Sequence, residues 1–220
     1  MTSHGNEQIA VQALQAGAAS YVPKRSLAKD LIETVQNVLS VSQRQTSRRR
    51  VLGTLAGVET RFVLESDTSL ITPMIAYLQE QIATMRLSDD LQLMRIGIVM
   101  HESLTNAIYH GNLELDSELR QVDESIFYSL AKERRRDDRY SGRRVHLTAQ
   151  LSATEVRLVV RDDGPGFDPS ELRNPTDEIN MDRIGGRGLL LIRSFMDEVS
   201  HNARGNEITM VKRATLKPQN

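Results

Sequence analysis

A carboxylate, a carboxamide and an imidazole recur at intervals of four residues near the middle of the chain. Glu102, Asn106 and His110 have the spacing that places side chains on one stripe of a helix. The amide oxygen of Asn106 can bind a hard cation such as Mg²⁺, and the carboxylate of Glu102 can accept a proton or orient a nucleophile. This stripe suits chemistry on a phosphate ester, but a polar stripe that only faces solvent has the same spacing.

A second candidate segment begins with Asp162, at the end of a predicted strand. Gly164 and Gly166 follow it at alternating positions. Glycines let a ligand come close to the backbone, and the carboxylate of Asp162 can accept a hydrogen bond from a ring amine. Ordinary turns also show the Asp-x-Gly-x-Gly pattern, so this segment indicates a ligand site only in combination with others.

A third segment is rich in glycine and precedes a helix predicted at 189–196. It consists of Gly185, Gly186, Arg187 and Gly188. Backbone N–H groups at a helix N-terminus attract anions, and Arg187 either adds a phosphate contact or faces solvent. The spacing fits neither the P-loop nor the dinucleotide-binding fingerprint. The polar residues 168–185, which lie between the second and third segments, are typical of a lid.

In this order the three segments resemble the GHKL ATPase superfamily, which includes histidine kinases, gyrase-type ATPases and anti-sigma-factor serine kinases. His101–Gly111 resembles the N box of that superfamily, Asp162–Phe167 its G1 box and Gly186–Leu189 its G2 box. Met196–Val199 and the short lid are most similar to the anti-sigma serine-kinase branch. The resemblance extends over about residues 60–215.

The resemblance implies a Bergerat-type ATP site, with ATP and Mg²⁺ as cofactors. Glu102 would be the general base, and Asn106 would bind the metal together with the ATP phosphates. Asp162 would accept a hydrogen bond from the adenine amine. The nucleotide-binding residues that it implies are Asn106, Asp162, Gly164, Gly166, Gly186, Arg187, Gly188 and Leu189.

The same resemblance implies transfer of the ATP γ-phosphate to a serine or threonine of a partner regulatory protein, similar to an anti-sigma antagonist. It also suggests a sigma factor and a second copy of the chain as partners. Two alternatives stay open. One is a nucleotide-dependent module that sequesters its partner without phosphorylating it, and the other is the ATP-binding domain of a two-component histidine kinase.

His101 bears on the histidine-kinase alternative, because His101–Thr105 is similar to the phosphoacceptor motif of those enzymes. Glu102 already belongs to the N-box pattern, however, and no pair of dimerisation helices precedes the motif. We therefore do not expect His101 to carry a phosphate. His110 is interpreted as a helix-end residue, because no other His lies at a spacing typical of metal ligands.

The order of the strands and helices that must position these segments predicts an α+β fold. We expect a two-layer α/β sandwich with helices on one face of a mixed sheet. Hydrophobic patterns predict strands at 61–65, 144–151, 155–161, 198–203 and 207–213, and helices at 69–85, 89–109 and 189–196. Gly111 follows the second helix, where a C-cap glycine is expected. Residues 114–140 predict an amphipathic helical insertion with an apolar stripe of Leu115, Leu119, Val122, Ile126 and Leu130. Packing of this stripe on its own domain is favoured over binding of a partner.

Residues 1–40 resemble the last third of a response-regulator receiver domain, with a short strand at 19–22 between two helices. Thr2 would match the switch hydroxyl, and Lys24 the lysine that pairs with the phosphate. The acidic pocket is missing, because Asp30 is the only Asp of this segment and falls in a predicted helix. Residues 41–59 predict a solvated linker rather than a nucleic-acid patch, because no aromatic residues alternate with the arginines.

Composition excludes several other classes of protein. The 220 residues are 39% hydrophobic and 26% charged, and a net charge of -1 argues against bulk electrostatic binding of nucleic acid. The absence of cysteine excludes disulfides, thiolate catalysis and Cys-based zinc sites. No stretch approaches the roughly 20 apolar residues that span a bilayer, and the N-terminus does not resemble a secretory signal. We therefore expect a cytoplasmic protein that binds neither membranes nor nucleic acid.

Overall fold

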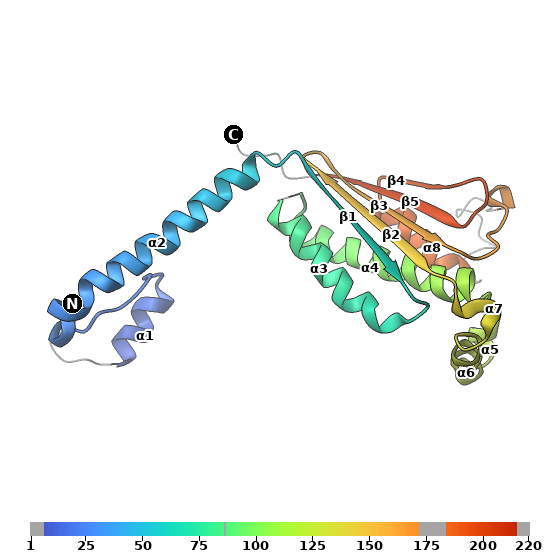
Figure 1. Cartoon of the computed structure of the whole chain (residues 1–220), viewed down its shortest axis with the longest axis horizontal. Coiled ribbons are helices and arrows are strands. Elements are labelled where there is room, and N and C mark those ends of the chain that lie inside the picture. Colours follow the sequence, from blue (N-terminus) through green and yellow to red (C-terminus); the bar gives the residue numbers. More distant parts are fainter. Residues whose placement is uncertain (1–6, 86, 172–183, 215–220) are drawn as a thin grey trace. The chain divides into compact units, whose positions relative to one another are not determined.

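The computed structural model describes residues 7–85, 87–171 and 184–214 (Figure 1). The chain divides into two compact units, Met1–Leu55 and Ala56–Asn220. All three candidate segments belong to the second unit.

The first unit is helical in its described part, 7–55. It contains α1 (Glu7–Gln15), the 3-10 turn η1 (Lys24–Ser26) and α2 (Leu27–Gly53). No strand forms within these residues, so the strand predicted at 19–22 is wrong. A single extended segment leaves its backbone N–H and C=O groups unpaired, and this unit offers it no described strand to pair with.

Helix α2 continues through residues 41–53, which are most of the segment that the sequence predicted as a linker at 41–59. Its residues after Val41 are mainly Ser, Gln and Arg, and Gln and Arg have high helix propensity. No proline or glycine interrupts the run before Gly53, where the helix ends. Only residues 54–56 therefore connect α2 to the first strand. None of the helices that the structure describes has the length and hydrophobicity needed to span a bilayer.

The second unit is built on a five-stranded sheet with the order β1-β2-β3-β5-β4. The strands are β1 (Gly57–Leu64), β2 (Val145–Ser152), β3 (Glu155–Asp162), β4 (Glu198–His201) and β5 (Glu207–Arg213). All neighbouring strands are antiparallel, whereas the sequence predicted a mixed sheet. The short connections after β2 and β4 explain part of this result, because a hairpin can join only antiparallel neighbours.

Three helices cover one face of this sheet (Figure 1): α3 (Ile71–Thr84), α4 (Asp90–Asn106) and α8 (Ile184–Phe195). Burial alternates along β3, where Val156, Leu158 and Val160 are buried and their neighbours are more exposed. The core between the layers also includes Leu78, Ile82, Val99, Met100, Leu104, Leu147 and Ile192. The predicted two-layer sandwich with helices on one face is confirmed.

The helix predicted at 89–109 ends differently from the prediction. Helix α4 stops at Asn106 and continues as a π-helical turn, Ala107–Asn112. Gly111 lies inside this turn and is not among the described glycines with a positive φ, so it is not the predicted C-cap glycine. A different constraint requires glycine here, because a Cβ would overlap the carboxylate of Asp162. The π turn is therefore the place where the α4 segment meets the end of β3.

The insertion after the π turn is helical and contains α5 (Ser117–Val122), α6 (Glu124–Arg134) and α7 (Asp138–Ser141). Asp123 separates α5 from α6, because its carboxylate accepts hydrogen bonds from two backbone N–H groups in the first turn of α6. This break shifts the phase of the apolar stripe. Val122 is 83% exposed and Ile126 is 53% exposed, whereas Phe127 is completely buried. The predicted stripe is thus wrong at Val122 and Ile126.

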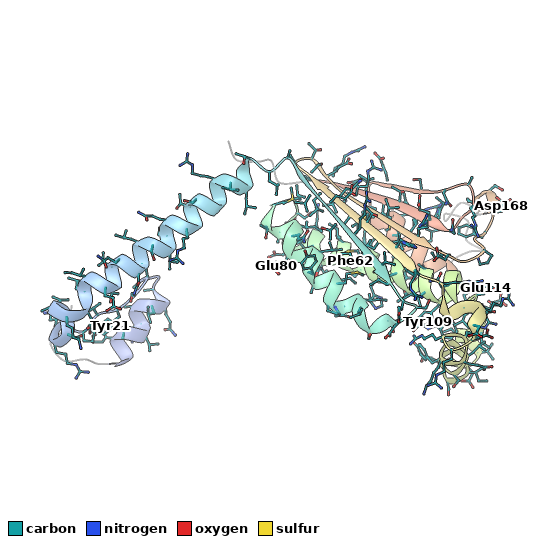
Figure 2. The ribbon with its side chains drawn as sticks, in the orientation of Figure 1. Tyr21, Phe62, Glu80, Tyr109, Glu114 and Asp168 are labelled. Atoms are coloured by element: carbon teal, nitrogen blue, oxygen red, sulfur yellow. The ribbon has the colours of Figure 1, made fainter. Side chains whose placement is uncertain are left out.

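Charged side chains tie the insertion to the π turn. Glu114, labelled in Figure 2, has a φ of 51°, and its carboxylate accepts a hydrogen bond from Arg143 Nη2 at 2.7 Å. Arg134 Nη1 donates to the carbonyl of Glu114 and to that of the preceding residue, at 2.6 Å each. The guanidinium groups of Arg134 and Arg143 both pack over the ring of Tyr140. This network fixes the point from which α5 begins.

Candidate functional site

A cavity of about 500 Å³ opens among α4, the π turn, the end of β3 and α8. Of the predicted site residues, Glu102, Asn106, Asp162 and Leu189 line it. The rest of the lining consists of Ser103, Ala107, His110, Ser117, Arg120, Val160, Phe167, Ile192, His201, Gly205, Asn206, Glu207 and Ile208.

Asp162 is the last residue of β3 and presents a buried carboxylate to the cavity. Burial raises the pKa of this carboxyl to about 6, against the opposing effect of the Gly164 N–H. That N–H donates to Oδ1 of Asp162 at 2.8 Å. The other oxygen, Oδ2, is thereby left to accept a hydrogen bond from a ligand.

Asn206, in the hairpin between β4 and β5, fixes the backbone of Asp162. Its Nδ2 donates to the Asp162 carbonyl at 2.7 Å, and the Asp162 N–H donates to the Asn206 carbonyl at 3.0 Å. Asn202 supports this clamp, because its Nδ2 donates to Asn206 Oδ1 at 2.9 Å. Sequence reasoning missed both asparagines. The signal that indicates them is an Asn on each side of a turn that contains glycine, since Asn side chains commonly bond nearby backbone groups.

The loop after Asp162 interlocks with the same hairpin. Gly166 and Gly205 have φ angles of 77° and 75°, and a Cβ on either one would overlap a backbone carbonyl of the facing segment. The Phe167 N–H donates to the Arg204 carbonyl at 3.1 Å. Gly164 packs on the π turn in the same manner. Gly164 and Gly166, both predicted to bind nucleotide, are absent from the described lining of the cavity, and their contacts support the loop that follows Asp162.

We expect Gly166→Ala to lower the free energy of unfolding by about 2 to 5 kcal/mol. A positive φ costs a side chain roughly 1–2 kcal/mol, and overlap with the Arg204 carbonyl adds about 1–3 kcal/mol of overpacking. Gly142→Ala is the matched control, because no atom lies within 4 Å of a Cβ at that position. Urea denaturation followed by circular dichroism measures both variants. Equal stability of the two would show that the interlock does not constrain the loop.

Asn112, the last residue of the π turn, holds the next residue of the loop. It is completely buried, and its Oδ1 accepts a hydrogen bond from the Asp163 N–H at 2.9 Å. Its Nδ2 donates to Ser66 Oγ at 3.2 Å. Sequence reasoning gave Asn112 no role, although its place directly after the segment that resembles the N box is a signal.

Glu102 and Asn106 lie one turn apart on α4, and both are half-buried in the cavity wall. Glu102 packs against Gly188 of α8 so closely that a Cβ on Gly188 would overlap its carboxylate. Gly188 is itself buried. The residue predicted as the base is therefore in direct contact with a glycine of the third segment.

The third segment lies inside α8 rather than before it. Helix α8 begins at Ile184, so Gly186 and Gly188 belong to its first two turns, whereas the sequence predicted a start at residue 189. Glycine weakens a helix, but packing of an apolar face can outweigh this cost. The apolar face of α8 is packed in this way, because its Ile192 is buried in the core. The side chain of Arg187 and residues 172–183 of the predicted lid lie outside the described residues.

A phenyl ring and an imidazole ring pack against each other in the cavity wall. His201 and Phe167 pack edge to face, with ring centroids 5.4 Å apart. Burial, followed by the positive charge of Arg193, lowers the pKa of His201, so its imidazole is neutral at pH 7. A neutral imidazole and a phenyl ring give this part of the wall a surface that suits a flat heterocycle. His110 instead places Nδ1 2.7 Å from the Leu115 carbonyl, as suits a helix-end residue.

The site suits a cation that arrives with its ligand. No group of three His, Asp or Glu side chains among the described residues could hold a metal. Mg²⁺ commonly keeps several waters and binds substrate phosphates together with one or two protein oxygens. Asn106 offers one amide oxygen on the cavity wall. This donor set fits Mg²⁺ bound jointly by protein and phosphates.

The sequence that forms this sheet and its helices matches a known domain family. Residues 64–212 match the model of the histidine kinase-like ATPase domain. The chain belongs to this family. Membership in an ATPase family implies ATP binding by this domain. The domain also has a buried carboxylate at the end of β3 and two polar side chains one turn apart on α4.

This ATPase domain also has a similar protein of recorded activity. Over 70 residues, 30% of the chain, it is 34% identical to the serine/threonine-protein kinase BtrW of Bordetella bronchiseptica. The match covers 49% of that kinase, so the chain spans about half the length of this curated relative. The similarity supports a kinase-like ATPase domain.

Proposed function

We propose that this ATPase domain is a protein kinase that transfers the γ-phosphate of ATP to a serine or threonine of a partner regulatory protein. The contact between Glu102 and Gly188 is the observation that carries the proposal. It puts a carboxylate beside the helix turn where the family resemblance expects the phosphates. The similarity to the kinase BtrW supports the same class of reaction. The resemblance of the sequence to the anti-sigma serine kinases suggests the partners: an antagonist of an anti-sigma factor, and a sigma factor as the second.

Five of the described residues that line the cavity have a role in this proposal. Oδ2 of Asp162 accepts a hydrogen bond from the adenine amine, and the base packs against the surface that Phe167 and His201 form. Asn106 gives an amide oxygen to Mg²⁺, which, when bound, neutralises charge on the β- and γ-phosphates. Glu102 accepts the proton of the attacking hydroxyl. The oxygen of that hydroxyl forms the new bond to phosphorus, and the bond between the γ-phosphorus and the bridging oxygen breaks, which leaves ADP.

Transfer of label from γ-labelled ATP tests the proposal. The purified chain is incubated with Mg-ATP and a soluble extract, and labelled proteins are identified together with the modified amino acid. A label that is stable in acid and is lost in base supports the proposal, because phosphoserine has these properties. An acid-labile label would instead identify the domain as part of a histidine kinase. Stoichiometric capture of a partner with no label and no ADP would identify a sequestration module.

We also propose that residues 1–40, which resemble part of a receiver domain, contain no aspartate that accepts a phosphate. Lys24 begins η1 and Asp30 lies in the first turn of α2, while Thr2 lies outside the described residues. A helix-surface Asp lacks the acidic, magnesium-binding pocket that aspartyl phosphorylation requires. Treatment with acetyl phosphate is expected to leave the intact mass unchanged. A stoichiometric acyl-phosphate adduct on Asp30 would contradict this proposal.

A further inference from the structure

Helix α5 of the insertion contributes to the cavity wall. Its residues Ser117 and Arg120 belong to the lining, although they lie outside the three segments that resemble the family boxes. Helix α5 also contacts α8, the helix that carries Gly188. The insertion thus adds side chains to the nucleotide cavity, in addition to extending the domain.

The charge of the cavity wall makes Arg120 unusual. Glu102, Asp162 and Glu207 give the wall three carboxylates, and Arg120 is the one Lys or Arg among the described residues that line it. A nucleoside triphosphate carries several negative charges, which these carboxylates repel. A cation in the wall therefore has a large effect on how well phosphates are accepted.

The Arg120 side chain is held in place by aromatic rings, and its one ion pair among the described residues, with Glu124, is long and exposed. Its guanidinium packs 5.9 Å from the ring centroid of Phe127 and 6.0 Å from that of Tyr128, and Nη2 donates to the Tyr128 hydroxyl at 3.4 Å. The Glu124 carboxylate is 3.8 Å from Nη2, and both side chains are more than half exposed. An exposed pair at this distance is weak, so a phosphate can replace it.

The base of α5 is fixed as well. Three guanidinium groups bind Glu114 and anchor the chain before α5: those of Arg134, Arg139 and Arg143. The completely buried Phe127 anchors α6 after it. Arg120 is therefore presented from a packed element. A prepositioned side chain loses less conformational entropy when it binds a ligand.

We propose that Arg120 binds the phosphate groups of the nucleotide and makes affinity depend on the number of phosphates. This inference rests on the proposed nucleotide site. A guanidinium suits the role because its planar fork can donate two hydrogen bonds to one phosphate group. The insertion then acts as a selector of ATP over ADP and adenosine.

The test compares ATP, ADP and adenosine binding to the whole chain by calorimetry, with Mg²⁺ present. Arg120→Ala is expected to weaken ATP binding by about 10- to 100-fold, which corresponds to the loss of a charge-assisted hydrogen bond. ADP binding should weaken less, and adenosine binding should stay unchanged. Arg120→Gln keeps the length of the side chain and should show the same order. Arg136→Ala is the control, because it removes an exposed arginine of the same insertion that is absent from the described lining.

Three outcomes would overturn the inference. Unchanged ATP affinity in both Arg120 variants would show that this side chain does not reach the phosphates. Equal weakening for ATP and adenosine would show a structural role for Arg120 in the wall. A parent chain that binds none of the three ligands would refute the proposed nucleotide function itself, and the role of Arg120 with it. Circular dichroism of both variants checks that α5 and α6 remain folded.

Discussion

Glu102→Gln is expected to reduce phosphotransfer by about 100-fold or more while leaving ATP affinity close to that of the parent. Gln has the shape of Glu and tolerates a helix, so the packing against Gly188 is kept. The amide cannot accept the proton of the attacking hydroxyl. The measurement is ADP release and label transfer under single-turnover conditions, with ATP affinity determined separately by calorimetry.

Glu80→Gln is the matched control for this prediction. Glu80, labelled in Figure 2, is an exposed residue of α3 and is absent from the described lining of the cavity. This variant should transfer phosphate at the parent rate. If Glu102→Gln also turns over ATP at the parent rate, another group is the base or the reaction needs none.

Asp162→Asn is expected to weaken ATP binding by about 10- to 150-fold and at the same time to stabilise the fold. The Gly164 N–H donates to Oδ1, so an amide at this position keeps its oxygen there and turns its NH2 into the cavity. That NH2 faces the adenine amine, donor against donor, and the charge-assisted hydrogen bond is lost. Such a bond contributes roughly 1.5–3 kcal/mol to binding.

The stability gain follows from the raised pKa of Asp162. The pKa rises from 3.8 to about 6 on folding, so the folded state holds the proton more tightly than the unfolded state. The free energy of unfolding of the parent should therefore fall as pH rises from about 4 to about 6 and stay level above that. At one pKa unit per 1.36 kcal/mol, the penalty above pH 6 is about 3 kcal/mol. Asp162→Asn removes it, so the variant should be more stable at pH 8 and equal to the parent near pH 4.

Urea denaturation at pH 4.5 and pH 8 measures this effect, and calorimetry measures ATP affinity. Asp163→Asn is the control, because Asp163 is exposed and is absent from the described lining of the cavity. It should change ATP affinity little. A variant Asp162→Asn that binds ATP as tightly as the parent would remove Asp162 from the adenine pocket.

Local patterns predicted much of the site because local geometry determines it. The four-residue interval between Glu102 and Asn106 follows from the helical repeat, and it holds for any helix at this position. Asp162 ends a strand whose alternating apolar residues are evident in the sequence. Gly188 was predicted to lie at the phosphates, in an anion site at a helix N-terminus, and the structure adds that the side chain of Glu102 packs directly against it.

Features that depend on distant contacts could not be predicted from local patterns. Gly111 is required by the carboxylate of Asp162, which lies 51 residues later at the end of β3, and the sequence alone gives Gly111 the appearance of a helix cap. The stripe through Val122 and Ile126 fits a single helix, and only the capping by Asp123 shifts it. The strand expected at 19–22 has the right composition, but a strand needs neighbours that residues 7–55 do not supply.

The clamp on Asp162 has a consequence for how the chain acquires its site during synthesis. Asn206 belongs to the hairpin between β4 and β5, and it follows all three segments that resemble the family boxes. A growing chain that has released α4, β3 and α8 from the ribosome still lacks the side chain that holds the backbone of Asp162. Under the proposed function, nucleotide binding therefore has to wait until β5 has paired with β3. Binding of ATP would then indicate that the chain has completed its five-stranded sheet.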